Sequence, residues 1–284
     1  MRVPTNQARA REIAHLLAGA FSHAEGILAE RDDLVENQIP RGAAAGSREH
    51  AAFLFFVVCH DHGVRSRDLY CRAKDMYGET PWLFSARSVV SRFAGPDDPS
   101  LIHATGERLG ARYPREAARC WYLNAQSLLT DYHAEPECVF RSSSTASQLL
   151  TRICAFRGYG PKTGGMLLRA AIGLGLADVR GEAEVLVPVD VHDARIAFYT
   201  GVLDRVDAPL DERLFRACVP QVQRVLRDAC REERVSWLDV DRALWLIGSR
   251  GCVYRRCSEC PLRHICSVGS QRRDAGQQQL APQE

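Results

Sequence analysis

The chain has 284 residues, of which 46% are hydrophobic and 25% are charged, and its formal net charge is +2. These values are ordinary for a soluble globular protein of one large domain or two smaller ones. They exclude a chain that attracts nucleic acid through its overall charge, so any basic surface must be local.

Two further features bear on the compartment. The longest apolar run, AAFLFFVVC at 51–59, is about half of the roughly 20 residues that a membrane-spanning helix needs, so we expect no membrane partner. Arginines and polar residues run through the first dozen positions, which is unlike a secretory signal. We therefore expect a reducing, cytoplasmic compartment, in which clustered cysteines bind metal more often than they form disulfides.

Helical periodicity covers most of the chain, and convincing strand alternation is nearly absent, so we predict an all-α fold. The expected helices lie at 6–32, 48–60, 64–76, 84–94, 100–109, 114–132, 146–155, 161–173, 191–203, 210–230 and 236–248. The stretch EVLVPV at 184–189 reads as a short extended entry into the next helix. Residues 268–284 are polar and rich in glutamine, which predicts a disordered tail.

The stretch FRGYGPKTGG, 156–165, has the form of a tight turn between two helices. Gly158 and Gly160 permit the positive φ angles of such a turn, and Pro161 suits the first turn of the helix that follows. The backbone N–H groups of the turn, with the helix N-terminus behind them, form a site suited to a DNA phosphate. An ordinary interhelical turn is the alternative interpretation.

A lysine directly follows this turn, although lysine is rare in the chain. Of the 37 basic residues only two, Lys74 and Lys162, are lysines. Arginine stays protonated, whereas a lysine can lose its proton and act as a nucleophile. Lys162 is therefore a candidate catalytic amine.

The stretch VPVDVHDARIAFYTGV, 187–202, supplies a candidate carboxylate. Asp190 stands just before a helical pattern, which predicts a helix N-cap with Asp193 in the first turn. The same cap keeps the Asp190 carboxylate ionised, so that it could stabilise a cationic sugar and assist a nearby amine. Both roles can hold together. We expect His192 to contact a phosphate or to cap the helix.

Taken together, FRGYGPKTGGMLLRAA and VPVDVHDARIA resemble the helix-hairpin-helix superfamily of DNA glycosylases, over about 146–203. In that family a lysine follows the hairpin in bifunctional members, and an aspartate follows in a Val-Asp-x-His context. Lys162 and Asp190 fall on these two positions. The resemblance implies a two-domain helical fold, a DNA cleft between a helical barrel and a second helical domain, and damaged or modified double-stranded DNA as the partner.

On this resemblance we divide the chain into four parts and expect a monomer. The parts are an N-terminal extension that packs with the C-terminal domain (1–46), a barrel that includes hairpin 156–162 (47–173), a helical domain with a cysteine loop (174–267), and the tail (268–284).

Four cysteines lie close together in CVYRRCSECPLRHIC, namely Cys252, Cys257, Cys260 and Cys266. Four thiolates can hold a [4Fe–4S] cluster or a zinc ion. The loop resembles the C-terminal cluster loop of endonuclease III, although its first spacing is x4 where that family usually has x6. We favour the iron–sulfur cluster, with zinc as the alternative. The same loop carries Arg255, Arg256 and Arg263, which we expect to meet phosphates.

The family's base-wedge residue aligns with FFVVCHDHGVRS, 55–66, where the glutamine common in endonuclease III is missing. His60, Asp61 and His62 occupy this window and are expected to line a base pocket. For His60 and His62, a surface position at a helix end is the alternative. The groups that we expect to contact DNA are Gly158, Tyr159, Gly160, Thr163, His192, Arg255, Arg256 and Arg263. For Tyr159, packing in the interior is the alternative.

The resemblance implies a DNA glycosylase with AP-lyase activity, in which Lys162 attacks the sugar C1′ with assistance from Asp190 and β-elimination follows. Three alternatives stay open. The first is a monofunctional glycosylase in which Asp190 activates water. The second is a helix-hairpin-helix DNA-binding protein without chemistry, and the third is a zinc-stabilised helical interaction protein.

Overall fold

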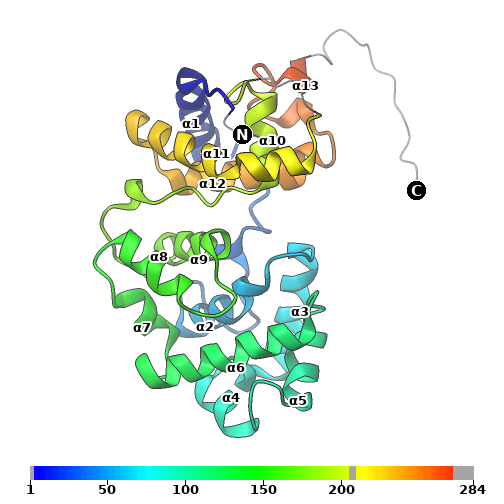
Figure 1. The fold of residues 1–284 in the computed structure, drawn as a ribbon, viewed down its shortest axis with the longest axis vertical. Helices are drawn as coiled ribbons and strands as arrows, with labels where there is room; N and C mark the ends of the chain where they lie inside the picture. The colour runs from blue at the N-terminus through cyan, green and yellow to red at the C-terminus, as the bar shows by residue number, and fades with distance from the viewer. Residues whose placement is uncertain (1–2, 205–208, 271–284) are drawn as a thin grey trace, which may run out of the picture. The chain divides into compact units, whose positions relative to one another are not determined.

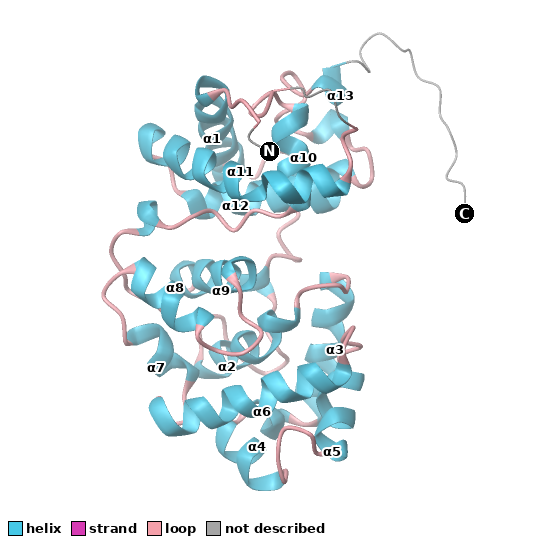
Figure 2. Cartoon of the chain, in the orientation of Figure 1, coloured by secondary structure: helices cyan, strands magenta, loops and turns pink. Residues whose placement is uncertain are grey.

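The computed structural model of the chain describes residues 3–204 and 209–270 (Figure 1). In these ranges the secondary structure is helical, apart from two isolated bridges that pair Thr5 with Leu203 and Thr145 with Arg180 (Figure 2). The predicted all-α fold is therefore confirmed. No helix among the described residues is long and apolar enough to cross a membrane.

The chain divides into two units. Residues Asp32–Pro188 form one, here called the continuous unit, and Met1–Arg31 together with Val189–Glu284 form the other, here called the discontinuous unit. These boundaries differ from the expected 46/47 and 173/174. Both 32–46 and 174–188 group with the predicted barrel.

Backbone contacts explain this difference. A short 3₁₀ turn, η2 (Val35–Asn37), packs on a helix of the continuous unit, α9 (Pro161–Gly173). Arg180 exchanges hydrogen bonds with the start of α8 (Ala146–Cys154), since its N–H donates to the Ser144 carbonyl and its carbonyl accepts from the Ala146 N–H. Composition alone did not reveal these ties.

The continuous unit is built around an apolar helix. Its α-helices are α2 (Arg48–Val57), α3 (Ser66–Glu79), α4 (Ala86–Arg92), α5 (Pro99–Ile102), α6 (Pro114–Asp131), α7 (Pro136–Arg141), α8 (Ala146–Cys154) and α9. Helix α2 is buried on nearly every side, and its Phe56 stacks on Trp121 of α6 with ring centroids 5.0 Å apart. Each such aromatic side chain stabilises the core by roughly 2–3 kcal/mol.

The discontinuous unit joins the two ends of the described chain. Its α-helices are α1 (Gln7–Ser22), α10 (Val191–Tyr199), α11 (Glu212–Glu233), α12 (Trp237–Leu246) and α13 (Ser267–Ser270). Helix α1 packs on α11 and α12. After α12 the chain makes a π-helical turn, η7 (Ile247–Cys252), and then a 3₁₀ turn, η8 (Cys257–Glu259), which leads through the cysteine loop.

Several predicted helices differ from the observed ones. The pattern at 6–32 continues past the end of α1, but Ala24 and Gly26 have positive φ angles that turn the chain out of the helix. The pattern at 100–109 is α5 followed by a π-helical turn, and α7 was not predicted because it is only six residues long. In the predicted tail 268–284, residues 268–270 complete α13, and residues 271–284 lie outside the described ranges.

Candidate functional site

The hairpin after α8 needs glycine at its first position only. Gly158 has φ +84°, in the left-handed region that favours glycine, whereas Gly160 is extended at φ −110° and caps α9. A Cβ on Gly158 would lie 3.0 Å from Cys120 Sγ and 3.3 Å from Cys59 Cβ, while a Cβ on Gly160 would meet nothing within 4 Å. The expectation that both glycines supply positive φ angles was therefore half right.

Hydrogen bonds to two helices hold the hairpin in place. Asn124 of α6, which is buried, donates to the Arg157 carbonyl at 2.9 Å and accepts from the Arg157 N–H at 2.8 Å. The Tyr159 hydroxyl donates to the carbonyl of Phe55 in α2 at 2.5 Å. Buried hydrogen bonds of this kind fix the turn before any ligand arrives.

Two side chains that we expected at the DNA surface are part of this framework. Tyr159 is 6% exposed, so its side chain packs in the interior, as the alternative interpretation held. Thr163 is also 6% exposed, and its hydroxyl accepts from the Gly160 N–H at 3.1 Å and donates to the Gly158 carbonyl. Both residues shape the hairpin from within.

Lys162 is the second residue of α9 and is half-buried. Asp61 follows the 3₁₀ turn η3 (Val58–His60), which packs on α9. Burial raises the pKa of the Asp61 carboxyl, while the Ser66 hydroxyl, which donates to Oδ1 at 2.7 Å, and the charge of Lys162 oppose that rise in pKa. The charge of Lys162 therefore acts on the Asp61 carboxyl and favours its ionised form.

The three residues that we expected to line a base pocket have different surroundings. His60 is buried, and its ring stacks on Trp121 at 5.8 Å, so burial lowers its pKa to about 3. It is a neutral core residue, which corrects both of our expectations for it. Asp61 is also buried, and only His62 is exposed.

Asp190 caps α10, as predicted. Its carboxylate accepts from the His192 N–H at 2.7 Å and from the Asp193 N–H at 3.4 Å, and the Asp193 carboxylate accepts in return from the Asp190 N–H at 2.8 Å. This reciprocal cap favours the ionised carboxylate. Asp190 belongs to the discontinuous unit and Lys162 to the continuous unit.

His192 is tied to the discontinuous unit. Its Nδ1 lies 3.2 Å from a guanidinium nitrogen of Arg195. A Cβ added at Gly248 would lie 3.0 Å from the Cβ of His192. Packing against η7 thus sets the orientation of this ring.

All four cysteines of the loop line one cavity of about 340 Å³, together with Arg195 and Tyr199. Burial raises the pKa of the Cys260 thiol to about 12, and Arg195 opposes a rise in the pKa of Cys252. Among the described residues no three His, Cys, Asp or Glu side chains converge on one metal-ion position. Four thiols around one cavity are the donor set of either a [4Fe–4S] cluster or a zinc ion.

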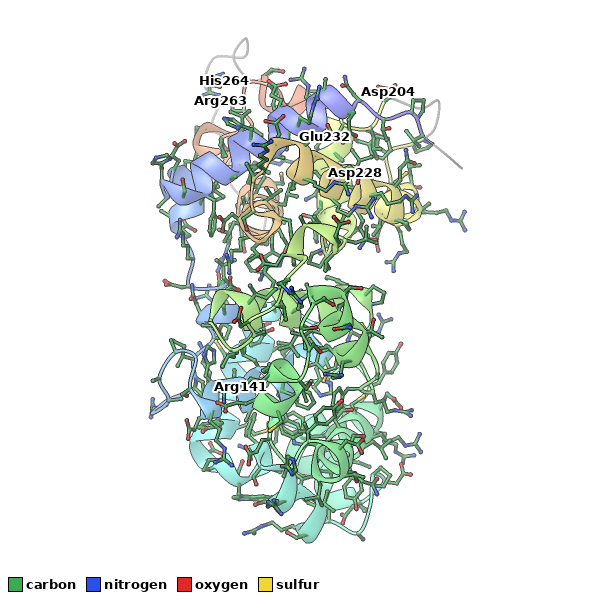
Figure 3. All side chains as sticks on the ribbon, turned by 90° about the vertical axis from the view of Figure 1, so that its left-hand side faces the viewer. Arg141, Asp204, Asp228, Glu232, Arg263 and His264 are labelled. Atoms are coloured by element: carbon green, nitrogen blue, oxygen red, sulfur yellow. The ribbon has the colours of Figure 1, made fainter. Side chains whose placement is uncertain are left out.

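The arginines of this loop are not equivalent. Arg256 forms ion pairs with Glu30 and Glu259, so it holds the loop to the segment after α1, and its expected phosphate contact stays a prediction. Gly26 permits the same approach, since a Cβ there would lie 2.2 Å from the Glu259 carbonyl oxygen. Arg255 is exposed, and Arg263 lies beside His264 at the edge of the discontinuous unit (Figure 3).

Sequence reasoning missed two residues that shape the site. Asn124 is a lone polar side chain on the apolar face of α6, which is the signal that could have revealed it. Ser66 lies five residues after Asp61 and carried no local signal, because the bond between them depends on the turn into α3.

No protein-family model matches the sequence, and no curated protein matches it. Solved structures do match. A trapped covalent complex of endonuclease III with DNA aligns over 95% of this chain and 100% of its own, with 16% identity and a TM-score of 0.58. A thermostable thymine-DNA glycosylase aligns over 93% and 98%, with 11% identity and a TM-score of 0.54. The 8-oxoguanine DNA glycosylase of Thermotoga maritima aligns over 86% and 99%, with 16% identity and a TM-score of 0.50. This chain therefore has the fold of the helix-hairpin-helix DNA glycosylases.

Proposed function

We propose that this protein is a DNA N-glycosylase of base excision repair with an associated AP-lyase activity. The observation that carries the proposal is a hairpin, Gly158 to Gly160, that buried hydrogen bonds hold in place. After Pro161 it is followed by Lys162, one of only two lysines in the chain. The N-cap carboxylate of Asp190 and the fold shared with three DNA glycosylases support it.

In the proposed reaction the hairpin amides and the α9 N-terminus hold a backbone phosphate, and the target nucleotide turns out of the duplex. Lys162 Nζ attacks C1′ as the N-glycosidic bond breaks, and the base leaves with the bonding electron pair. Asp190 stabilises the cationic sugar and accepts the proton that Nζ loses. The C1′–O4′ bond then breaks, O4′ takes up a proton, and the adduct becomes a Schiff base. Loss of a C2′ proton from the Schiff base expels the 3′-phosphate, and this β-elimination cuts the strand. In this reaction Lys162 and Asp190 act on the same sugar.

The cysteine loop would hold a [4Fe–4S] cluster through Cys252, Cys257, Cys260 and Cys266, with zinc as the alternative. When bound, the cluster would supply a rigid support for the loop. Arg255 and Arg263 would then present fixed cations to phosphates, and exposed His62 would lie near the duplex. Visible absorption and iron content of anaerobically purified protein test this part.

A monofunctional glycosylase is the second candidate, because the reciprocal cap of Asp190 and Asp193 by itself favours an ionised carboxylate at the start of α10. There Asp190 would activate water, and no covalent adduct would form. A DNA-binding protein without chemistry and a zinc-stabilised interaction protein are the remaining alternatives.

Borohydride trapping on a panel of single-lesion duplexes tests these proposals. We expect a covalent adduct and a nick with the unmodified protein, none with Lys162→Ala, and an unchanged yield with Lys74→Ala, which removes the only other lysine. An alkali-labile abasic site without an adduct would indicate the monofunctional enzyme. Binding without either product would overturn the enzymatic proposal.

A further inference from the structure

Asp61 is a buried carboxylate that the proposed reaction leaves unused. It is 5% exposed, and its Oδ1 accepts a hydrogen bond from Ser66 at 2.7 Å. Its Oδ2 is fully buried, and the buried Tyr70 hydroxyl also favours the ionised carboxyl by hydrogen bonding. Hydroxyl donors alone do not offset the cost of burying a charged carboxylate, so a compensating charge is to be expected nearby.

The backbone brings Asp61 to the start of α9. Two residues before it, Cys59 lies against the hairpin, since a Cβ on Gly158 would lie 3.3 Å from the Cys59 Cβ and 3.6 Å from its carbonyl oxygen. The Asp61 N–H donates to the Val58 carbonyl at 3.0 Å, which fixes the end of η3 against α9. Lys162 is the second residue of that helix.

Of the groups that favour the ionised Asp61 carboxyl, Lys162 is the cation on α9. His62, on its own segment, also favours the ionised carboxyl, and from α3 the Ser66 and Tyr70 hydroxyls do the same. Burial and the charge of Asp61 raise the pKa of the Tyr70 phenol. Arg169 lowers that pKa and Cys59 raises it. His60 is buried and neutral.

We propose that Asp61 is a positioning residue that holds the Lys162 amine in its ammonium form near neutral pH, and so limits how much base removal proceeds to strand cleavage. The first part rests on the geometry within the continuous unit. The second part rests on the proposed function. Because an ammonium cannot attack C1′, a carboxylate that stabilises it slows covalent chemistry below the pKa of the amine.

The two lysines make the first part directly measurable. Protein labelled with ¹³C at the lysine ε-carbon gives two signals, and Lys162→Arg assigns them. Asp61→Asn keeps an acceptor for Ser66 and removes the charge, so the pKa of Lys162 should fall by about one unit while that of Lys74 stays unchanged. Ser66→Ala weakens ionisation of Asp61 and should give a smaller shift in the same direction. Asp68→Asn, an exposed carboxylate on α3, is the matched control and should leave Lys162 unchanged.

Trapping on a duplex with a preformed abasic site tests the second part. The pH profile of Asp61→Asn should move down by about one unit, which gives roughly tenfold faster trapping on the acidic limb. If the Lys162 signal titrates identically in Asp61→Asn and in the unmodified protein, the inference is wrong. If that signal shifts but no variant forms an adduct, the charge coupling stands and the proposed lyase function fails.

Discussion

The hairpin and the cysteine loop are stabilised in different ways. The hairpin is held by buried hydrogen bonds from Asn124 and Tyr159 to main-chain groups, and its clamps lie in the core of the continuous unit. The cysteine loop is held by the partly exposed ion pairs of Arg256, and its four thiols face a cavity. The hairpin is thus held by buried contacts, whereas the cysteine loop is the region in which the proposed cluster would add stability.

Removing a cysteine ligand should have the largest effect. If the proposed [4Fe–4S] cluster is bound, Cys260→Ser should abolish its visible absorption and lower the Tm by about 10 °C or more, because the loop would lose the cluster. Calorimetry and iron analysis measure these changes. The control is Cys71→Ser, an exposed cysteine on α3. A colourless unmodified protein that contains zinc would contradict the iron–sulfur assignment.

Removing the Asn124 hydrogen bonds to the hairpin should lower stability less than the loss of a cysteine, but it should weaken DNA binding. Asn124→Ala leaves both main-chain groups of Arg157 without these partners, which should destabilise the fold by about 2–3 kcal/mol. Urea unfolding measures the loss, and gel shift should show weaker binding to abasic DNA. Gln126→Ala, an exposed change on α6, should do neither. Equal stability of the two variants would show that Asn124 does not hold the turn.

The two hairpin glycines offer an internal comparison. Gly158→Ala forces a side chain into the left-handed region and against two cysteines, so it should cost roughly 1–3 kcal/mol. Gly160→Ala meets open space at an extended φ and should change stability little. Thermal melts of both proteins suffice. Similar losses of stability at the two positions would contradict the conclusion that only Gly158 needs to be glycine.

The smallest expected effect concerns pH. The pKa of Asp61 is raised above its ordinary 3.8, so its ionisation destabilises the native state as the pH rises through that window. Asp61→Asn should therefore increase the free energy of unfolding by about 1 kcal/mol at pH 7, and the gain should vanish near pH 3.8. Chemical unfolding at several pH values checks this. A constant gain at every pH would point to packing instead of ionisation.

Local patterns predicted much of the site. The helix–turn–helix, the Asp190 cap and the four cysteines were readable because each depends on neighbours within about a dozen residues. The roles of Asn124, Ser66 and the buried ring of His60 depend on which helices pack together, and a single sequence does not carry that information. The unit boundaries at 31/32 and 188/189 were missed for the same reason, since backbone bonds between distant segments set them.

The discontinuous unit combines an early segment with a late one, and this has a consequence for biosynthesis. Residues 32–188 can fold on the ribosome as soon as they emerge, whereas α1 must wait for α11 and α12 before it can bury its apolar face. The nascent chain would thus carry a formed hairpin and an unpaired amphipathic helix at the same time. Chaperone binding during translation should therefore concentrate on α1 and should end when α12 has left the exit tunnel.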